Sequence, residues 1–151
     1  MDHKLDSIDK KIIEMLQKNA RVSIKEMAKE VFLSSPAVSA RIEYLEKSGI
    51  ISGYHAQVNP MLLGYHIKAF INLEVDPSQK KEFYPFIQTI PNVIECNCVT
   101  GDYSMLIEVV YRSTAELDHF INVLQQFGRT KTLLVFSTAV EHRDLPIPNE
   151  F

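Results

Sequence analysis

The spacing of apolar residues changes once along this 151-residue chain, and the change limits the folds that the chain can adopt. Up to about residue 49 the apolar residues recur at helical spacing, whereas from residue 67 they alternate with polar residues, as they do in strands. Asn59-Pro60 and Gly64, which are residue types typical of turns, lie between the two parts. The sequence therefore predicts two domains, 1–59 and 67–151, with a linker over residues 60–66.

Three capped helices are predicted in the first domain. Asp6 and Ser23 each stand before an apolar helical series and have an acidic residue three positions later, which is the pattern of a capping box. Ser35 is the expected N-cap of the third helix, with Pro36 at its first position, and Gly49 is expected to end it. Residues 50–58 are rich in strand-forming residues around Ser52-Gly53, which predicts a short hairpin. These elements, in this order, predict a winged helix-turn-helix.

In a winged helix-turn-helix the third helix presents its N-terminal residues to the major groove of double-stranded DNA. Small side chains there allow close approach to the bases, and Arg41 can contact a guanine or a phosphate. Ser23 and Lys25, at the start of the second helix, are candidate phosphate contacts. The candidate DNA-binding residues are Ser23, Lys25, Ser34, Ser35, Pro36, Ala37, Ser39, Ala40, Arg41, Tyr44 and Lys47. The alternative is that these residues form the ordinary solvated face of a common three-helix pattern.

The second domain is predicted to have the order βαββαβ. Strands are expected over residues 67–75, 92–100, 104–111 and 131–140 from their alternating apolar residues. One helix is expected after Asp76, with a kink or early break at Pro85. The other is expected after Ser113, with Glu116 completing a capping box and Gly128 as the C-cap. The whole chain is therefore assigned to the α+β class, its second half being a ferredoxin-like unit with both helices on one sheet face.

The face of this sheet without helices is predicted to be apolar and exposed. Its expected members are Phe70, Leu134, Phe136 and Val140, with either Cys96 and Cys98 or their neighbours. An exposed apolar face of that size favours an oligomer interface, so we expect a homodimer formed sheet to sheet. The last residues, 144–151, are expected to be extended, and either loose or packed on a neighbour.

The distribution of charge bears on DNA binding. The formal net charge of −3 argues by itself against a nucleic-acid partner. Counted along the sequence, however, residues 1–60 carry +1 and residues 61–151 carry −4. A single N-terminal domain is therefore expected to bind DNA weakly, and a paired assembly is expected to be needed for useful affinity.

Several other functions are not supported by the sequence. Cys96 and Cys98 are too few for a metal site, and the five histidines show no ligand spacing. We find no Gly-rich phosphate-binding motif and no catalytic constellation, so neither a cofactor nor enzymatic activity is expected. No apolar run could span a membrane, and the first residues do not form a secretory signal. The expected location is the cytoplasm.

The chain resembles the Lrp/AsnC (feast/famine) regulators over roughly residues 5–141. The similarity lies in the shared order and spacing of several short motifs: Leu5-Asp6-x-Ile8-Asp9, Arg21-Val22-Ser23, Leu33-Ser34, Val38-x-x-Arg41, Leu45-Glu46-x-x-Gly49-x-Ile51 and Gly53-Tyr54-x-Ala56. The resemblance implies a sequence-specific transcriptional regulator with a C-terminal RAM-type domain. It also implies homodimers that assemble into tetramers or octamers, and an amino-acid effector bound between dimers.

The resemblance also points to an effector loop, formed by Thr100, Gly101, Asp102, Tyr103 and Ser104. Many members carry an Asp where this chain has Ser104, and that carboxylate helps to bind the ammonium group of the ligand. Asp102 could replace it only if the loop turns differently, and Gly101 could simply permit a hairpin turn. Ser52 likewise stands where many members have a basic wing residue. The alternative function is an architectural protein that wraps DNA with low sequence specificity and has no effector.

Overall fold

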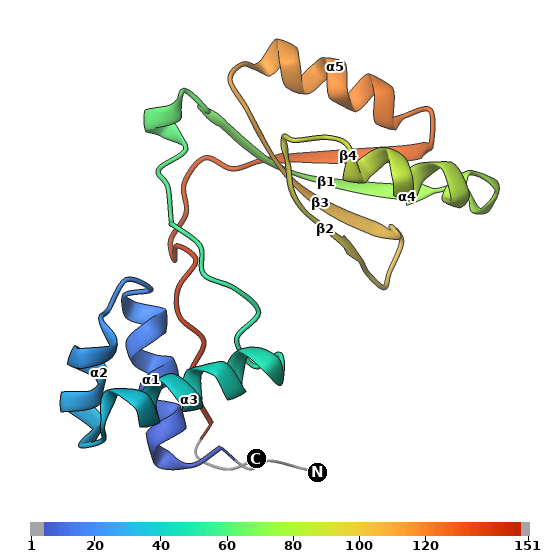
Figure 1. The fold of residues 1–151 in the computed structure, drawn as a ribbon. Helices are drawn as coiled ribbons and strands as arrows, with labels where there is room; N and C mark the ends of the chain where they lie inside the picture. The colour runs from blue at the N-terminus through green and yellow to red at the C-terminus, as the bar shows by residue number, and fades with distance from the viewer. Residues whose placement is uncertain (1–4, 149–151) are drawn as a thin grey trace. The chain divides into compact units, whose positions relative to one another are not determined.

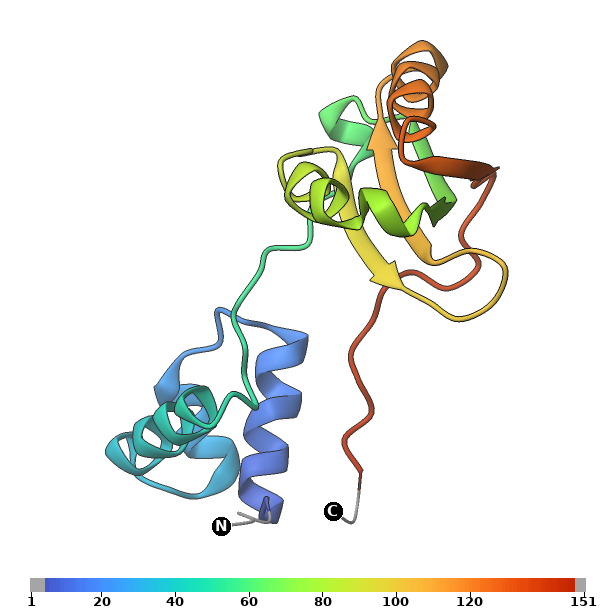
Figure 2. The same ribbon diagram turned by 90° about the vertical axis from the view of Figure 1, so that its right-hand side faces the viewer.

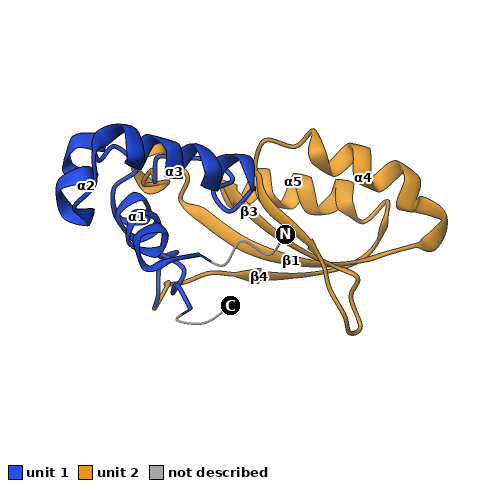
Figure 3. Ribbon diagram, turned by 60° about the horizontal axis from the view of Figure 1, so that its bottom comes forward, with its two compact units in different colours: residues 1–57, 140–151 blue, residues 58–139 orange. Residues whose placement is uncertain are grey.

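The computed structural model describes residues 5–148 and divides the chain into two compact units (Figures 1 and 3). The first unit, here called the head, combines the residues up to 57 with those from 140 onward. The second, here called the sheet unit, comprises residues 58–139. Within residues 5–148 no helix is long and apolar enough to cross a membrane.

The head contains the three predicted helices, α1 (Ser7–Lys18), α2 (Ile24–Val31) and α3 (Ser35–Lys47). Both capping boxes predicted for the head are present: the Asp9 N–H donates to Asp6 Oδ1 at 2.8 Å, and the Glu26 N–H donates to Ser23 Oγ at 3.1 Å. The N-cap of α3 is Ser34 and not Ser35, because the Ala37 N–H donates to Ser34 Oγ. The helices enclose a core that consists of Ile12, Ile13, Met27, Ala28, Val31, Val38 and Leu45.

The predicted hairpin over residues 50–58 does not form in this structure. These residues contain no strand, and the Ile51 N–H donates instead to the Leu45 carbonyl at the end of α3. Richness in strand-forming residues is therefore insufficient here, because a strand also needs a neighbouring backbone to pair with, and no segment of residues 5–148 pairs with this one.

Residues 135–148 contain no helix or strand and follow an extended course (Figure 2). The end of this segment packs on the head. Gln17 binds the backbone of Leu145 at two points, accepting from its N–H at 2.9 Å and donating to its carbonyl at 3.1 Å. Ile147 is half-buried against the head core. The described part of the tail thus packs on its own chain, and residues 149–151 lie outside the described residues.

The sheet unit confirms the predicted ferredoxin-like order. Its elements are β1 (Ile67–Val75), α4 (Lys80–Gln88), β2 (Val93–Cys98), β3 (Met105–Tyr111), α5 (Thr114–Leu124) and β4 (Gly128–Leu134). The strands form one antiparallel sheet in the order β2-β3-β1-β4, and α4 and α5 cover the same face (Figure 3). Alternate residues of β1 and β3 point to that face and are buried, together with Phe83 of α4 and Leu117 of α5.

Four details of this unit differ from the prediction. The capping box of α5 is incomplete: the Ser113 hydroxyl accepts from the Glu116 N–H at 3.2 Å, but the Glu116 carboxylate accepts from the Arg112 N–H instead of the Ser113 N–H. Helix α4 continues through Pro85 to Gln88. The C-cap of α5 is Gln125, and Gly128 is the first residue of β4, which ends at Leu134 instead of residue 140. Gly128 is paired with Val75, and a Cβ atom at Gly128 would lie 1.7 Å from the Glu74 carbonyl oxygen. Because glycine has no Cβ atom, Gly128 allows β4 to approach β1 this closely.

The open face of the sheet carries other apolar residues than predicted, since Phe136 and Val140 lie beyond the end of β4. The register pairs Phe70 with Leu133, whereas Leu134 is paired with Ala69 and so belongs to the helix-covered side. Cys96 and Cys98 are paired with Ile107 and Met105 and also lie on that side, so it is their neighbours Glu95 and Asn97 that lie on the open face. The open face carries the apolar residues Phe70, Leu106, Val110 and Leu133 and two ion pairs, Lys68–Glu108 and Glu74–Arg129, each at 3.0 Å.

Candidate DNA-binding surface and ligand loop

The start of α3 offers a small, uncharged surface. Ser34, Ser35, Pro36 and Ala40 are exposed, while Val38 and Leu45 hold the opposite side of the helix in the core. Ala37, Ser39 and Tyr44 are half-buried. Small exposed side chains on the second helix of a helix-turn-helix allow the backbone to approach base edges closely, and serine hydroxyls can bond bases or phosphates.

Arg41 is held by two carboxylates that lie far from it in the sequence. Its Nη1 atom lies 2.7 Å from a carboxylate oxygen of Asp6 and 2.7 Å from one of Asp9. Arg41 therefore connects α3 to the capping box of α1. Partial burial raises the pKa of Asp6, but the hydrogen bonds from the Asp9 N–H and from Arg41 outweigh this effect and lower the pKa below its ordinary value. No local pattern could reveal this contact, because its partners are more than 30 positions apart in the sequence.

The other basic residue of α3 is also paired. Lys47 forms an ion pair with Glu43 one turn earlier, and this contact lowers the pKa of Glu43. Glu46 accepts a hydrogen bond from the Tyr54 hydroxyl at 2.8 Å. Burial and this carboxylate raise the pKa of Tyr54 to about 12. The exposed part of α3 thus presents small side chains and hydroxyl groups, while its two basic side chains are paired with carboxylates.

At the start of α2 the two predicted phosphate contacts differ in availability. The Ser23 hydroxyl is engaged in the capping box, where it donates to Glu26 Oε2 at 2.9 Å and accepts from the Glu26 N–H. Hydrogen bonds from the N–H and the hydroxyl of Ser23 lower the pKa of Glu26. Lys25 is exposed and takes part in no ion pair among the described residues. Lys25 is therefore the better placed of the two for a phosphate.

Phe32 is a residue that sequence reasoning missed. It lies in the turn between α2 and α3, has a left-handed backbone with φ of 56°, and is 93% exposed. A left-handed conformation is unfavourable for a residue with a Cβ atom, and no packing of the ring compensates for it. The sequence contains one sign of this conformation: Phe32 stands at the end of a short helix, where a left-handed residue is normally Gly or Asn.

The predicted effector loop joins β2 to β3. Gly101 has φ of +108°, and both Gly101 and Asp102 are exposed. The Ser104 hydroxyl is tied to β1: it accepts from the Val75 N–H at 3.0 Å and donates to the Leu73 carbonyl at 3.2 Å. Ser104 thus anchors the loop to the sheet, which leaves Thr100, Gly101 and Asp102 as the exposed part of the loop.

The loop also has a charged neighbour. The Arg129 guanidinium carbon lies 4.9 Å from the centre of the Tyr103 ring. Among residues 5–148 no three His, Cys, Asp or Glu side chains are grouped as metal ligands would be. The chemistry available at this loop is therefore that of hydrogen bonds, one exposed carboxylate and a nearby guanidinium.

Together the two units define a class of protein: a helix-turn-helix DNA-binding protein that carries a separate α+β domain. Comparison with known families identifies that class further. Residues 5–52 match a winged helix-turn-helix DNA-binding family, and residues 68–145 match the Lrp/AsnC ligand binding domain. The chain belongs to the Lrp/AsnC family of transcriptional regulators.

Relatives and solved structures support this assignment along nearly the whole chain. The HTH-type transcriptional regulator FL11 of Pyrococcus furiosus is 35% identical over 95% of this chain and 97% of its own length. LrpA of Bacillus subtilis is 36% identical over 87% of this chain and 97% of its own. The structure of B. subtilis LrpC superposes with a TM-score of 0.87 at 32% identity, covering 92% of this chain and 99% of that one. A Neisseria meningitidis transcriptional regulator, solved as an L-Met complex, has a TM-score of 0.87 at 26% identity, covering 94% and 96%.

Proposed function

We propose that this chain is a sequence-specific DNA-binding transcriptional regulator whose affinity for its operators depends on a small molecule bound by the sheet unit. The observation that carries the proposal is the exposed, uncharged start of α3 in a domain of a DNA-binding family. The sheet unit supplies the second half of the mechanism, because it matches a ligand-binding domain. We propose no catalytic step and a cytoplasmic location.

We assign separate roles to the residues of the DNA surface. Ser35, Pro36 and Ala40 face base edges, where the apolar atoms suit thymine methyl groups and the hydroxyl suits a polar base edge. Ser34, Ala37, Ser39 and Tyr44 flank them, and Lys25 and the backbone start of α2 at Ser23 contact phosphates. Lys47 contacts a phosphate by exchanging its exposed pair with Glu43 for that phosphate. Arg41 orients α3 on α1 and does not read a base, because Asp6 and Asp9 already hold its guanidinium.

Pairing of heads follows from the charge of this surface. Phosphate contacts supply most of the sequence-independent affinity of a DNA-binding protein, and both basic residues of α3 are paired within the head. Two heads in a homodimer would multiply their modest contributions. We propose that the open sheet face forms the dimer and that dimers assemble into a tetramer or an octamer.

For the effector we propose an amino acid held by the loop from Thr100 to Tyr103. The L-Met complex of the Neisseria meningitidis regulator supports this class of ligand. Because Ser104 is tied to β1, the ammonium group would depend on Asp102. A thermal-shift screen of all amino acids tests this proposal, and Asp102→Asn should abolish any shift that is found.

The DNA-binding proposal is tested by fluorescence anisotropy with the DNA upstream of the chain's own gene and with unrelated DNA at moderate salt. Ala40→Glu should lower affinity for the upstream DNA at least tenfold, because it places a carboxylate against the groove. Ala20→Glu is the matched control, since Ala20 is also exposed but lies between α1 and α2. Equal affinity for both DNAs would contradict sequence-specific binding.

The paired state of Arg41 and Lys47 also favours a second candidate, an architectural protein that wraps DNA with little sequence preference. Footprinting separates the two. Protection repeated at about one helical turn over many sequences would support wrapping, whereas one discrete footprint would support the regulator.

A further inference from the structure

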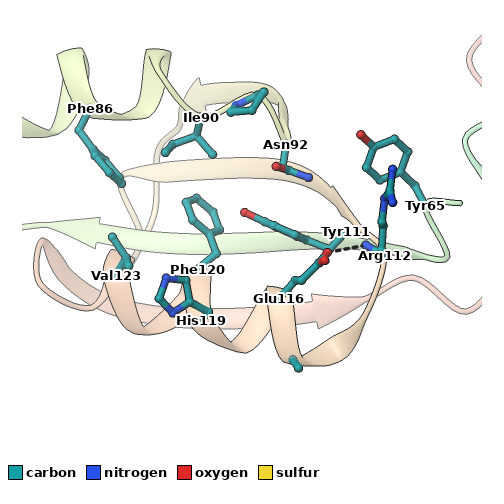
Figure 4. Close-up of a pocket in the computed structure, with 12 residues that line it drawn as sticks. Tyr65, Phe86, Ile90, Asn92, Tyr111, Arg112, Glu116, His119, Phe120 and Val123 are labelled. Atoms are coloured by element: carbon teal, nitrogen blue, oxygen red, sulfur yellow. Dashed lines mark hydrogen bonds between the residues drawn. The ribbon is translucent and has the colours of Figure 1, made fainter. Parts of the chain in front are cut away.

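A pocket of about 800 Å³ lies in the sheet unit, between α4, α5 and the end of β3 (Figure 4). Its volume is within the range of small-molecule sites. The apolar part of its lining includes Phe86 and Ile90 from the α4 side and Phe120 and Val123 from α5. None of the residues of the loop over 99–104 lines it, so this pocket is separate from the proposed effector loop.

Tyr111 supplies a polar group inside this pocket. The residue is only 7% exposed, and its ring packs beside Phe120 at a centroid distance of 5.7 Å. Its hydroxyl points into the pocket (Figure 4), where it is open to solvent and makes no hydrogen bond to any residue between 5 and 148. Burial and the charge of Glu116 raise the pKa of Tyr111 to about 12, so the hydroxyl keeps its proton at neutral pH. A donor in this position lacks a protein acceptor and is available to a ligand.

The rim of the pocket carries a cation. The Arg112 guanidinium carbon lies 5.8 Å from the centre of the Tyr65 ring, and Figure 4 shows the two side chains next to each other. Within the described chain this guanidinium has no carboxylate partner. Glu116, on the α5 side of the rim, accepts a hydrogen bond from the Arg112 backbone N–H at 3.0 Å. A ligand carboxylate would therefore bind on the Tyr65 side, away from Glu116.

We propose that this pocket binds a small organic carboxylate with an aromatic body and a polar atom at the far end. The carboxylate pairs with Arg112 at the rim, the ring lies among Phe86, Ile90 and Phe120, and the Tyr111 hydroxyl donates to the inner polar atom. Recognition thus needs no ammonium group on the ligand, unlike recognition of an amino acid at the loop over residues 100–103. The inference stands whether or not that loop binds an effector.

Three probes separate the parts of this recognition: 4-hydroxyphenylacetate, phenylacetate, which lacks the inner hydroxyl, and 4-hydroxyphenylethanol, which lacks the carboxylate. Binding to the full chain is measured by ligand-observed NMR titration. We expect 4-hydroxyphenylacetate to bind about fivefold more tightly than phenylacetate, as for one neutral hydrogen bond. We expect about a tenfold advantage over the alcohol, as for one charge-assisted contact. Equal affinities for all three, or no binding at millimolar concentration, would overturn the proposal.

Variants assign the contacts. Tyr111→Phe should reduce 4-hydroxyphenylacetate to the affinity of phenylacetate and leave phenylacetate unchanged. Arg112→Gln should weaken both carboxylates about tenfold and spare the alcohol. Lys81→Gln removes an exposed charge on α4 outside the pocket and should change nothing.

A variant at the rim keeps the test valid if Tyr111→Phe fails to fold. Ala115 is exposed and lines the pocket, so Ala115→Phe fills the pocket without disturbing the core. It should abolish binding of all three probes while the melting temperature is retained. Unchanged binding in a folded Ala115→Phe protein would place the probes elsewhere and refute the site. Binding of 4-hydroxyphenylacetate should persist in Asp102→Asn, whereas its loss there would assign it to the loop.

Discussion

Arg41 shows how a residue suited to DNA contact can instead stabilise its domain. Because Asp9 is 8% exposed, removal of the guanidinium would leave a nearly buried carboxylate without its ion-pair partner. Arg41→Gln should lower the free energy of unfolding of the head by about 1–3 kcal/mol, measured by urea denaturation. Lys47→Gln, which breaks an exposed pair, should cost less than about 1 kcal/mol. Equal effects would contradict the structural role.

The same cluster predicts a dependence on pH. The pKa of Asp6 is lower in the folded head than the ordinary value of 3.8. Its contribution to stability is therefore fully present above the ordinary pKa and is lost as the pH falls through the lower, folded value. The urea midpoint of the head should fall in this acid range, and Asp6→Asn should show a smaller fall. An identical pH profile for both proteins would show that Asp6 does not contribute.

Phe32 predicts a stabilising substitution. Phe32→Gly should raise the free energy of unfolding by about 1 kcal/mol, because glycine adopts the left-handed conformation freely and the exposed ring contributes no packing. Phe32→Ala, which keeps a Cβ atom, is the matched control and should not stabilise. Thermal melting of the three proteins compares them directly. A destabilised Phe32→Gly protein would indicate that the ring packs against something in the assembled protein.

At the scale of elements, the approach of β4 to β1 depends on Gly128. A methyl group there would overlap the Glu74 carbonyl oxygen, so Gly128→Ala should destabilise the sheet unit by about 3 kcal/mol. Gly101→Ala is the control: its φ is also positive, but its Cβ atom would meet open space, and the expected cost is about 1 kcal/mol. Calorimetric melting of the full chain measures both. If the two substitutions lowered the free energy of unfolding by similar amounts, glycine would be needed at position 128 for its backbone conformation and not for the close approach of the strands.

Elements whose causes are local were predictable from the sequence. The capping boxes at Asp6 and Ser23 and the alternation over residues 67–75 correspond to α1, α2 and β1 in the structure. The hairpin over residues 50–58 and the start of β4 were predicted wrongly, because both depend on what pairs with them. For the same reason the engagement of Arg41 and Ser104 with distant residues could not be seen in any short motif.

At the scale of the whole molecule, the tail makes the head discontinuous in sequence. Leu145→Pro removes the N–H that binds Gln17, and we expect it to destabilise the head by about 1 kcal/mol. Leu145→Ala is the matched control, because this side chain is 74% exposed and only the backbone is used. Hydrogen exchange of the α1 amides measures the effect. If both variants exchange alike, the tail contributes nothing through this bond.

The two-point bond between Gln17 and Leu145 also has a consequence for synthesis. Residues 1–57 leave the ribosome first, but the backbone that Gln17 binds and the apolar side chain of Ile147 emerge only after the entire sheet unit, some seconds later. A nascent chain therefore carries a three-helix domain with an unfilled contact on α1. A chain released from the ribosome before residue 145 would never form that contact. Only chains translated through the tail therefore reach the full stability of the head.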